Sequence, residues 1–243
     1  MVKKIKYNYI ERGKKTIVLL HGWGLDKSSF DGLVHFFCGE LSVLAIDFPG
    51  FGESDKAEDY YDTYEYAYRI FLLICELGLK DIILVGHSFG GRVAIILSSV
   101  FGIEICGLIL TSSAGLNRFS LIKEIRIMKY KLMKKLHSIG VIKNDKFLNG
   151  GSEDYKKLDV LMKGVFVRIV NQDLSYLLKN ISVDTKLVWD KKDKDTPYWI
   201  CKKLHKNIKT SQTIIFNNGG HFCYIYNIFK FAKICNNYLI IDT

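Results

Sequence analysis

The sequence predicts an α/β fold with a mostly parallel sheet, and three observations support this prediction. Short apolar runs rich in β-branched residues alternate with stretches of helical periodicity along most of the 243 residues. Such alternation indicates strand–helix–strand crossovers, which cover both faces of a parallel sheet. The composition, 49% hydrophobic and 25% charged, is typical of a globular chain and excludes a disordered one. A chain of this length also buries a sizeable core without disulfides.

Six apolar runs are predicted as strands, and residues 5–10 are predicted to add an antiparallel edge strand. The six runs are Thr16–Leu20, Val43–Asp47, Ile82–Val85, Ile105–Thr111, Lys186–Asp190 and Thr213–Phe216. Helices are predicted at Tyr64–Leu77 and at residues 89–101, 197–207 and 224–238, from apolar residues at helical spacing. Sheets of this kind bind ligands at the carboxyl ends of their strands, so we expect the functional site there.

One stretch, residues 116–180, breaks the alternation and is predicted to be wholly helical. It carries 14 Lys and Arg against 6 Asp and Glu, so it holds a net +8 of the total charge of +10. One helical face collects apolar residues, and basic residues crowd the remainder; the apolar set is Leu121, Ile125, Met128, Leu132 and Leu136. We therefore predict a core made of residues 1–115 and 181–243, with residues 116–180 inserted as a helical cap, or lid.

Three interpretations of the basic cap remain open. A solvated face is favoured, because charge runs usually are solvated. Recruitment of an anionic substrate, or of a membrane surface carrying one, is the second. Nucleic-acid binding is disfavoured, because no recognition motif accompanies the charge. For a partner of the basic cap, anionic and lipid-like molecules are therefore both open, with at most peripheral membrane contact.

Targeting and metal-binding patterns are missing from the sequence. The apolar run Ile17–Leu20 is too short for a signal-peptide core, and Val93–Leu110 is interrupted by Gly102, Glu104 and Gly107. The sequence has six cysteines and no CxxC pair; the cysteines are Cys38, Cys75, Cys106, Cys201, Cys223 and Cys235. This spacing favours free thiols in a reducing cytoplasm over a zinc site or a disulfide scaffold. We expect a cytoplasmic protein that holds no metal and uses no cofactor.

The strongest motif is Gly86-His87-Ser88-Phe89-Gly90, a G-x-S-x-G pattern between a predicted strand and a predicted helix. A serine on such a sharp turn adopts a strained backbone conformation, and its neighbours must be small, which explains Gly86 and Gly90. The helix that follows offers backbone N–H groups and its positive dipole end to a developing oxyanion. The pattern therefore predicts a nucleophilic serine.

With its other motifs, the chain resembles the α/β-hydrolase superfamily, in the branch of small serine hydrolases with a helical cap. The matching segments run in the family's order over nearly the whole length. They are the oxyanion-loop motif His21-Gly22-Trp23-Gly24, the D-x-P-G-x-G-x-S loop Asp47–Ser54, the nucleophile elbow Gly86–Gly91, the acid segment Leu187–Pro197 and the histidine segment Gly219–Phe222. The resemblance implies an α/β-hydrolase fold.

The resemblance also implies a role for each site residue. Ser88 would be the nucleophile and His221 the base that takes its proton and later protonates the leaving group. Asp193 would orient the imidazole and stabilise its charged form. The backbone N–H groups of Trp23 and Phe89 would bind the oxyanion. Among the remaining residues, His21 is expected to brace the oxyanion loop, His87 to pack at the elbow and Asp47 to have a structural role.

The acid assignment has an alternative, because Asp190, Asp193 and Asp195 crowd one loop. The family usually has glycine where this chain has Asp190, so this residue could repel Asp193, shift its pKa or replace it. Asp193 is preferred because it matches the family position.

These residues predict a hydrolase that cleaves an acyl bond, most readily a carboxylic ester, through an acyl-enzyme on Ser88. The expected partner is therefore a small acyl substrate, with anionic and lipid-like substrates both open, and no nucleic acid. A serine at the elbow disfavours the carboxylate-dependent dehalogenases and epoxide hydrolases of this fold. Cleavage of a C–C bond in a vinylogous diketone, thioester hydrolysis and acyl transfer stay open as alternatives. For the C–C reaction the substrate carboxylate would need an arginine, with Arg92, Arg118 and Arg168 as candidates. A non-catalytic ligand-binding protein is the alternative from another class.

Overall fold

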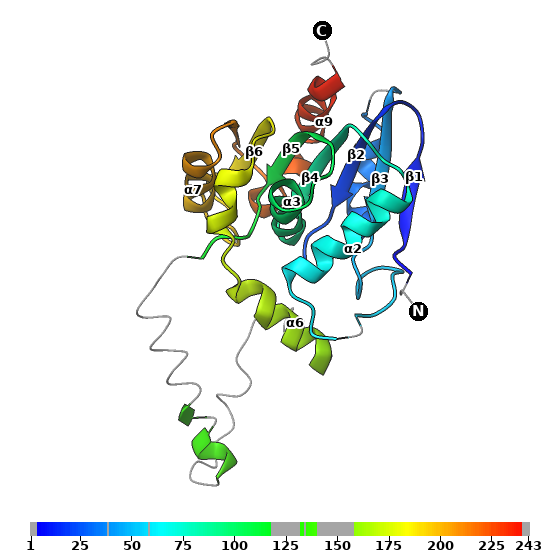
Figure 1. Cartoon of the computed structure of the whole chain (residues 1–243). Helices are drawn as coiled ribbons and strands as arrows, with labels where there is room; N and C mark the ends of the chain where they lie inside the picture. Colours follow the sequence, from blue (N-terminus) through cyan, green and yellow to red (C-terminus); the bar gives the residue numbers. More distant parts are fainter. Residues whose placement is uncertain are drawn as a thin grey trace.

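The computed structural model describes residues 4–37, 39–57, 59–117, 132–133, 135–139 and 158–239. These residues form a seven-stranded sheet with the order β1-β3-β2-β4-β5-β6-β7 (Figure 1). Strand β1 pairs antiparallel with β3, and all other pairs are parallel, as the sequence predicts. The strands are β1 Tyr7–Ile10, β2 Lys15–Leu20, β3 Leu41–Ile46, β4 Ile82–His87, β5 Ile105–Thr111, β6 Thr185–Asp190 and β7 Ser211–Phe216.

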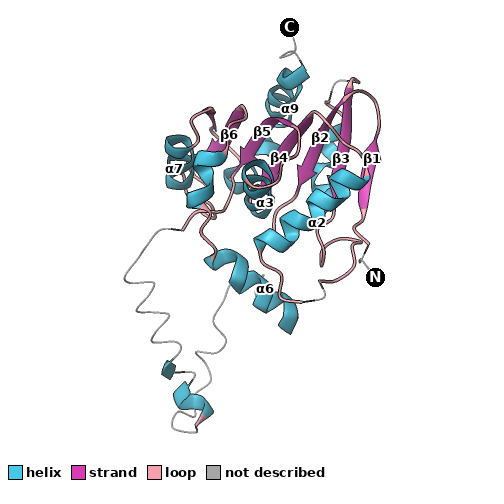
Figure 2. Cartoon of the chain, viewed as in Figure 1, coloured by secondary structure: helices cyan, strands magenta, loops and turns pink. Residues whose placement is uncertain are grey.

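Helices cover both faces of the sheet (Figure 2). On one face lie α2 Thr63–Glu76, α3 Phe89–Ser99 and α7 Trp199–Asn207. On the other face lie α1 Asp31–Val34, α8 Cys223–Tyr226 and α9 Ile228–Asn236. Helix α6, Val160–Asn171, lies beyond one end of the sheet. Short 3₁₀ helices are η1 Lys27–Phe30, η3 Ser175–Asn180, η4 Gly220–Phe222 and η5 Asn237–Leu239, and residues 132–133 and 135–138 are also helical.

The central strands are buried on both sides, which is what a parallel sheet between two helical layers requires. In β2, Val18 and Leu20 join the core under α2 and α3, whereas Ile17 and Leu19 join the core under α1 and α9. All four side chains are fully buried. Because both faces of these strands are apolar, the strands occur in the sequence as near-continuous apolar runs. This explains why they could be recognised as central strands.

Some predicted boundaries were wrong. The helix expected at 224–238 is divided at Asn227, which leaves helical geometry (φ −122°, ψ 39°) and donates through its side chain to the carbonyls of Asn218 and Cys223. The third strand begins two residues earlier than predicted and ends before Asp47. Residues 172–174 are not helical, because α6 ends at Asn171 and the next residue, Gln172, is extended. The prediction of a wholly helical 116–180 is therefore wrong at this point.

Much of the predicted cap lies outside the described residues, including Leu121, Ile125 and Met128 of the predicted basic amphipathic helix. The described part of the predicted cap contains α6. This helix begins after Asp159, whose carboxylate accepts a hydrogen bond from the N–H of Met162 (2.8 Å). In the described part of the chain, every helix is too short or too polar to cross a bilayer. Five of the six cysteines are described, and all five are free thiols.

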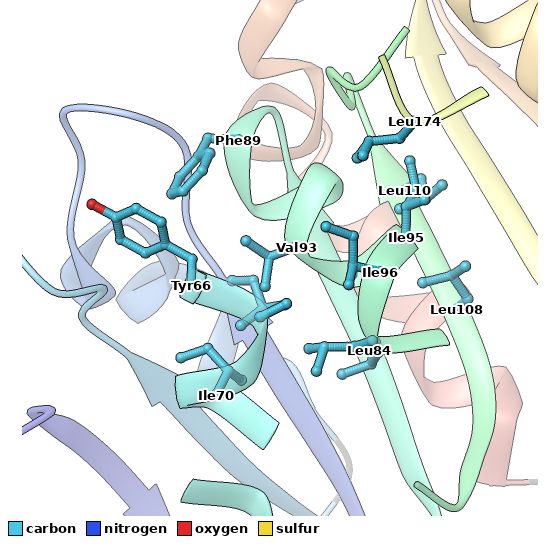
Figure 3. Close-up of a cluster of buried hydrophobic side chains, with 14 of the residues drawn as sticks. Tyr66, Ile70, Leu84, Phe89, Val93, Ile95, Ile96, Leu108, Leu110 and Leu174 are labelled. Carbon is cyan, nitrogen blue, oxygen red and sulfur yellow. The ribbon is translucent and has the colours of Figure 1, made fainter. Parts of the chain in front are cut away.

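The core beneath the predicted elbow fixes α3 firmly against the sheet (Figure 3). Val93 and Ile96 of α3 lie among buried residues of β4, β5 and α2, including Leu84, Leu108 and Ile70. All five side chains are fully buried. A helix that is packed this tightly holds its first residues, and hence Ser88 before them, in one position.

Candidate active site

The G-x-S-x-G motif forms a sharp turn between β4 and α3. Ser88 has φ 50° and ψ −109°, an uncommon conformation for a residue with a side chain. The turn is held by hydrogen bonds from Ser88 N–H to Thr111 O (3.3 Å) and from Gly91 N–H to Ser88 O (3.1 Å). A Cβ on Gly86 would lie 2.6 Å from the carbonyl oxygen of Gly90, and a Cβ on Gly90 would lie 2.0 Å from that of Leu20. Both motif glycines are therefore needed for the close approach of β4, α3 and β2. The backbone is thus strained at the predicted nucleophile.

The loop after β2 is braced by His21, as the sequence predicts. Phe48 N–H donates to His21 Nε2 (3.1 Å), so the proton lies on Nδ1, which donates to Gly22 O (2.8 Å). Burial lowers the pKa of His21 to about 4, which keeps the ring neutral. Asp47 likewise has a structural role, because its carboxylate accepts hydrogen bonds from the N–H groups of Lys27 (2.7 Å) and Glu53 (2.9 Å).

Two backbone N–H groups are available next to Ser88. Within the described chain, no hydrogen bond uses the N–H of Trp23 or that of Phe89. Both residues line one cavity with Ser88. The Trp23 ring contacts Phe89 (centroids 5.5 Å apart) and Phe166 of α6 (5.1 Å), so the loop, the elbow and α6 are held together by aromatic packing. The arrangement has the donors that an oxyanion hole requires.

Asp193 and His221 lie in contact, although 28 residues separate them. The imidazole Nδ1 donates to Asp193 Oδ2 (3.0 Å) and lies 3.2 Å from Oδ1. Burial raises the pKa of the Asp193 carboxyl, but hydrogen bonds from His221 and Thr196 outweigh it and bring the pKa to about 2. Asp193 is therefore ionised at neutral pH. Thr196, which the sequence analysis did not single out, donates to this carboxylate through its N–H (2.9 Å) and its hydroxyl (2.7 Å).

Asp190 has hydrogen-bond partners other than the imidazole of His221. Its Oδ2 accepts the N–H of Gly220 (2.9 Å) and its Oδ1 accepts the N–H of Lys192 (2.8 Å). The carboxylate thereby fastens the loop that carries His221 to the end of β6. The departure from glycine at position 190 thus has a structural reason, which sequence reasoning missed because the two loops are far apart along the chain.

A cavity of about 420 Å³ is lined by Ser88, Trp23 and His221. Asp193 is not part of its wall and is connected to it through the hydrogen bond with His221. The other described walls of the cavity are apolar or aromatic for the most part; they are Gly22, Leu25, His87, Phe89, Arg92, Ala114, Phe166, Ile169, Val170, Asp195, Thr196 and Phe222. Within the described residues no hydrogen bond joins Ser88 to His221. Contacts of this kind are often long before a substrate binds, so the shared cavity is the more informative observation.

One group of residues in the described chain has the chemistry of a cation site. The ligand atoms of Asp193, Asp195 and His221 lie within 4.8 Å of one another. Two of these residues already use their polar atoms in the Asp193–His221 hydrogen bond. The prediction that the protein holds no metal stays a prediction.

The buried histidines predict a loss of stability in mild acid. Burial lowers the pKa of His87 to about 3 and that of His21 to about 4, below the ordinary value of 6.5. Below pH 6.5 the unfolded chain therefore binds protons that the folded chain excludes, and the free energy of unfolding falls as the pH falls. We expect each histidine to contribute a loss of about 3 kcal/mol between pH 6.5 and pH 4.

Urea unfolding at several pH values measures this effect. The variant His87→Gln places a side chain that does not titrate at the same position, so we expect its loss of stability over the same pH interval to be clearly smaller. An unchanged pH dependence in this variant would show that His87 is not held neutral in the folded protein.

The fold and the site together define a class of protein. The chain belongs to the alpha/beta hydrolase family, because the family model matches residues 17–227. In this chain, the sheet brings a serine, a histidine and an aspartate to the carboxyl ends of β4, β7 and β6.

Individual relatives are similar at low identity over almost the whole chain. The pimeloyl-acyl-carrier-protein methyl ester esterase of Wigglesworthia glossinidia brevipalpis is 24% identical, with 98% of both chains covered. A karrikin insensitive 2 receptor from Petunia hybrida is 25% identical, with 86% of each chain covered. The solved esterase of Exiguobacterium antarcticum has a TM-score of 0.75 at 22% identity, covering 98% of this chain and 96% of its own. That last likeness shows the fold alone.

Proposed function

We propose that the protein is a serine hydrolase that cleaves an acyl bond, with a carboxylic ester as the preferred substrate. The observation that carries this proposal is the coupling of Asp193 to His221 Nδ1 beside the cavity that also holds the strained Ser88. A carboxylate that accepts a hydrogen bond from Nδ1–H keeps the proton on that nitrogen and leaves the other ring nitrogen as the base, which is what activation of a serine hydroxyl requires. The similarity to a curated methyl ester esterase supports the ester class.

In the proposed mechanism, Ser88 is first acylated and then deacylated. His221 Nε2 takes the proton of Ser88 as its oxygen attacks the ester carbonyl, and Asp193 stabilises the imidazolium that forms. The N–H groups of Trp23 and Phe89 donate to the oxyanion of the tetrahedral intermediate. His221 then protonates the leaving alcohol, which yields an acyl-enzyme on Ser88. Water, deprotonated by the same imidazole, releases the acid and restores the serine.

A fluorophosphonate probe tests whether the serine is activated. We expect the purified protein to be labelled on Ser88 and to release methanol from methyl esters. The variants Ser88→Ala and His221→Ala should neither be labelled nor hydrolyse esters. Ser113 is a buried serine near the elbow, so Ser113→Ala serves as a matched control that keeps both properties. Labelling that persists in Ser88→Ala would refute the assignment of the nucleophile.

Ligand binding without turnover is the second candidate, favoured by the similarity to a curated receptor. The two candidates differ in the fate of the substrate. Stoichiometric binding of an ester that is recovered intact, with Ser88 unlabelled by the probe, would favour the binding protein.

A further inference from the structure

Arg92 is a buried cation in the wall of the candidate active-site cavity. It lies one helical turn after Ser88, in the first part of α3, and only 5% of its surface is exposed. It lines the same cavity as Ser88 and His221. The side chain leaves α3 toward the end of α6, where Nη1 donates to the carbonyl oxygen of Gln172 (2.8 Å).

The charge of Arg92 has no ion-pair partner among the described residues. Among the described residues, Arg92 makes one hydrogen bond, the one to Gln172 O, although a guanidinium has five N–H donors. Asp173 acts on it electrostatically, but it lies beyond ion-pair distance. Burial lowers the pKa of Arg92 to about 10, so the group still carries its charge at neutral pH. A buried cation with unused donors is costly unless an anion completes it.

The rest of the cavity limits where an anion can sit. Asp195, an exposed carboxylate in the wall, has an oxygen within 4.8 Å of a ligand atom of His221, so it repels an anion from that part of the cavity. Phe166, Ile169 and Val170 of α6 add apolar wall. A ligand that fits these walls therefore has an apolar middle and an anionic group directed at Arg92.

We propose that Arg92 binds a carboxylate of the substrate, so that the preferred substrates are half esters of dicarboxylic acids. The preference for half esters as substrates rests on the proposed ester hydrolysis, and it is measured by the rate of that reaction. A carboxylate matches the planar guanidinium and accepts two of its parallel N–H groups. Arg92 is thus a specificity-determining residue: it recognises the end of the acyl chain that does not react.

The rival explanation is structural, because the bond to Gln172 O also ties α3 to the end of α6. The two explanations differ in what they predict for two matched sets of substrates. The monomethyl esters of succinic to suberic acid carry the carboxylate. The methyl esters of the monocarboxylic acids of equal chain length lack it.

Methanol release gives kcat/KM for both sets. We expect wild type to prefer a half ester, and Arg92→Gln to lower the ratio of half-ester to neutral-ester kcat/KM about 10- to 100-fold, mostly through KM. Arg92→Lys should retain part of the preference. Arg168→Gln on α6 is the control, because it removes the same charge outside the described cavity wall. The Arg168 guanidinium donates to Tyr60 O, and we expect its replacement to leave the ratio unchanged. An equal loss on both sets in Arg92→Gln, or a wild-type preference for neutral esters, would overturn the inference.

Calorimetry on the Ser88→Ala protein separates this inference from the proposed function, because it needs no turnover. We expect a monomethyl dicarboxylate to bind, and the added change Arg92→Gln to weaken binding about 10-fold or more. Binding that depends on Arg92 in a protein whose wild type shows no hydrolysis would refute the ester function and keep the carboxylate site. Binding that is equal with and without Arg92 would refute the carboxylate site.

Discussion

Replacing Asp193 by asparagine is expected to lower kcat for ester hydrolysis about 10³- to 10⁴-fold, with little effect on the fold. An asparagine oxygen can still accept the N–H groups of Asp195 and Thr196, which Asp193 Oδ1 accepts at 2.9 Å each. What is lost is the charge opposite His221 Nδ1. Without it the imidazolium is no longer stabilised, and the amide NH₂ group favours the ring tautomer that cannot take the serine proton.

The matched control is Asp190→Asn, the same chemical change three residues earlier. Asp190 contacts the N–H groups of Lys192 and Gly220 and has no hydrogen bond with the imidazole. We expect it to lower kcat about 10-fold or less, through looser positioning of the histidine loop. Circular dichroism checks that both variants fold. If Asp190→Asn lost the larger part of the activity and Asp193→Asn kept it, the assignment of the acid would be reversed.

Part of the site could be predicted because the chemistry depends on local patterns. The turn at Ser88 needs an apolar strand, two glycines and a helix in immediate succession, and all of these are visible in the sequence. The carboxyl ends of parallel strands share one edge of a sheet, so the strand predictions alone bring Trp23, Asp193 and His221 toward Ser88. The observed order of the strands agrees with this reasoning.

The remainder could not be predicted, because it depends on contacts between distant segments. The tie from Asp190 to Gly220 spans 30 residues, and the bond from Arg92 to Gln172 spans 80. Neither partner has a sequence pattern that indicates the other. The break at Asn227 is of the same kind: the apolar spacing continues through it, and only the contacts of its side chain with Asn218 and Cys223 show why the helix is interrupted there.

Replacing Gly90 by alanine is expected to destabilise the fold by about 3 kcal/mol or more, and to abolish activity with it. An added Cβ would lie 2.0 Å from the carbonyl oxygen of Leu20 and 2.8 Å from that of His21. Both are backbone atoms of β2 and the loop that follows it, so no side-chain rotation relieves the clash. Overpacking typically costs 1–3 kcal/mol even where side chains can adjust, so about 3 kcal/mol is a lower limit for a rigid contact.

The same substitution also moves the catalytic groups. Gly90 N–H donates to His21 O (3.0 Å), which joins the elbow to the oxyanion loop. If the elbow and the oxyanion loop are pushed apart, the N–H of Phe89 moves away from that of Trp23. Any protein that still folds should therefore have lost stabilisation of the oxyanion. Urea unfolding and fluorophosphonate labelling measure the two effects separately.

Gly102→Ala is the matched control, because a Cβ at that position meets nothing within 4 Å. We expect it to change the free energy of unfolding by less than about 1 kcal/mol, with stabilisation the more favoured direction, since alanine restricts the unfolded chain. A Gly90→Ala protein as stable as Gly102→Ala would mean that β2 and α3 are not in close contact at the elbow. The contact between these two elements is what brings the serine and the oxyanion donors together, so the catalytic proposal and the stability prediction depend on the same few atoms.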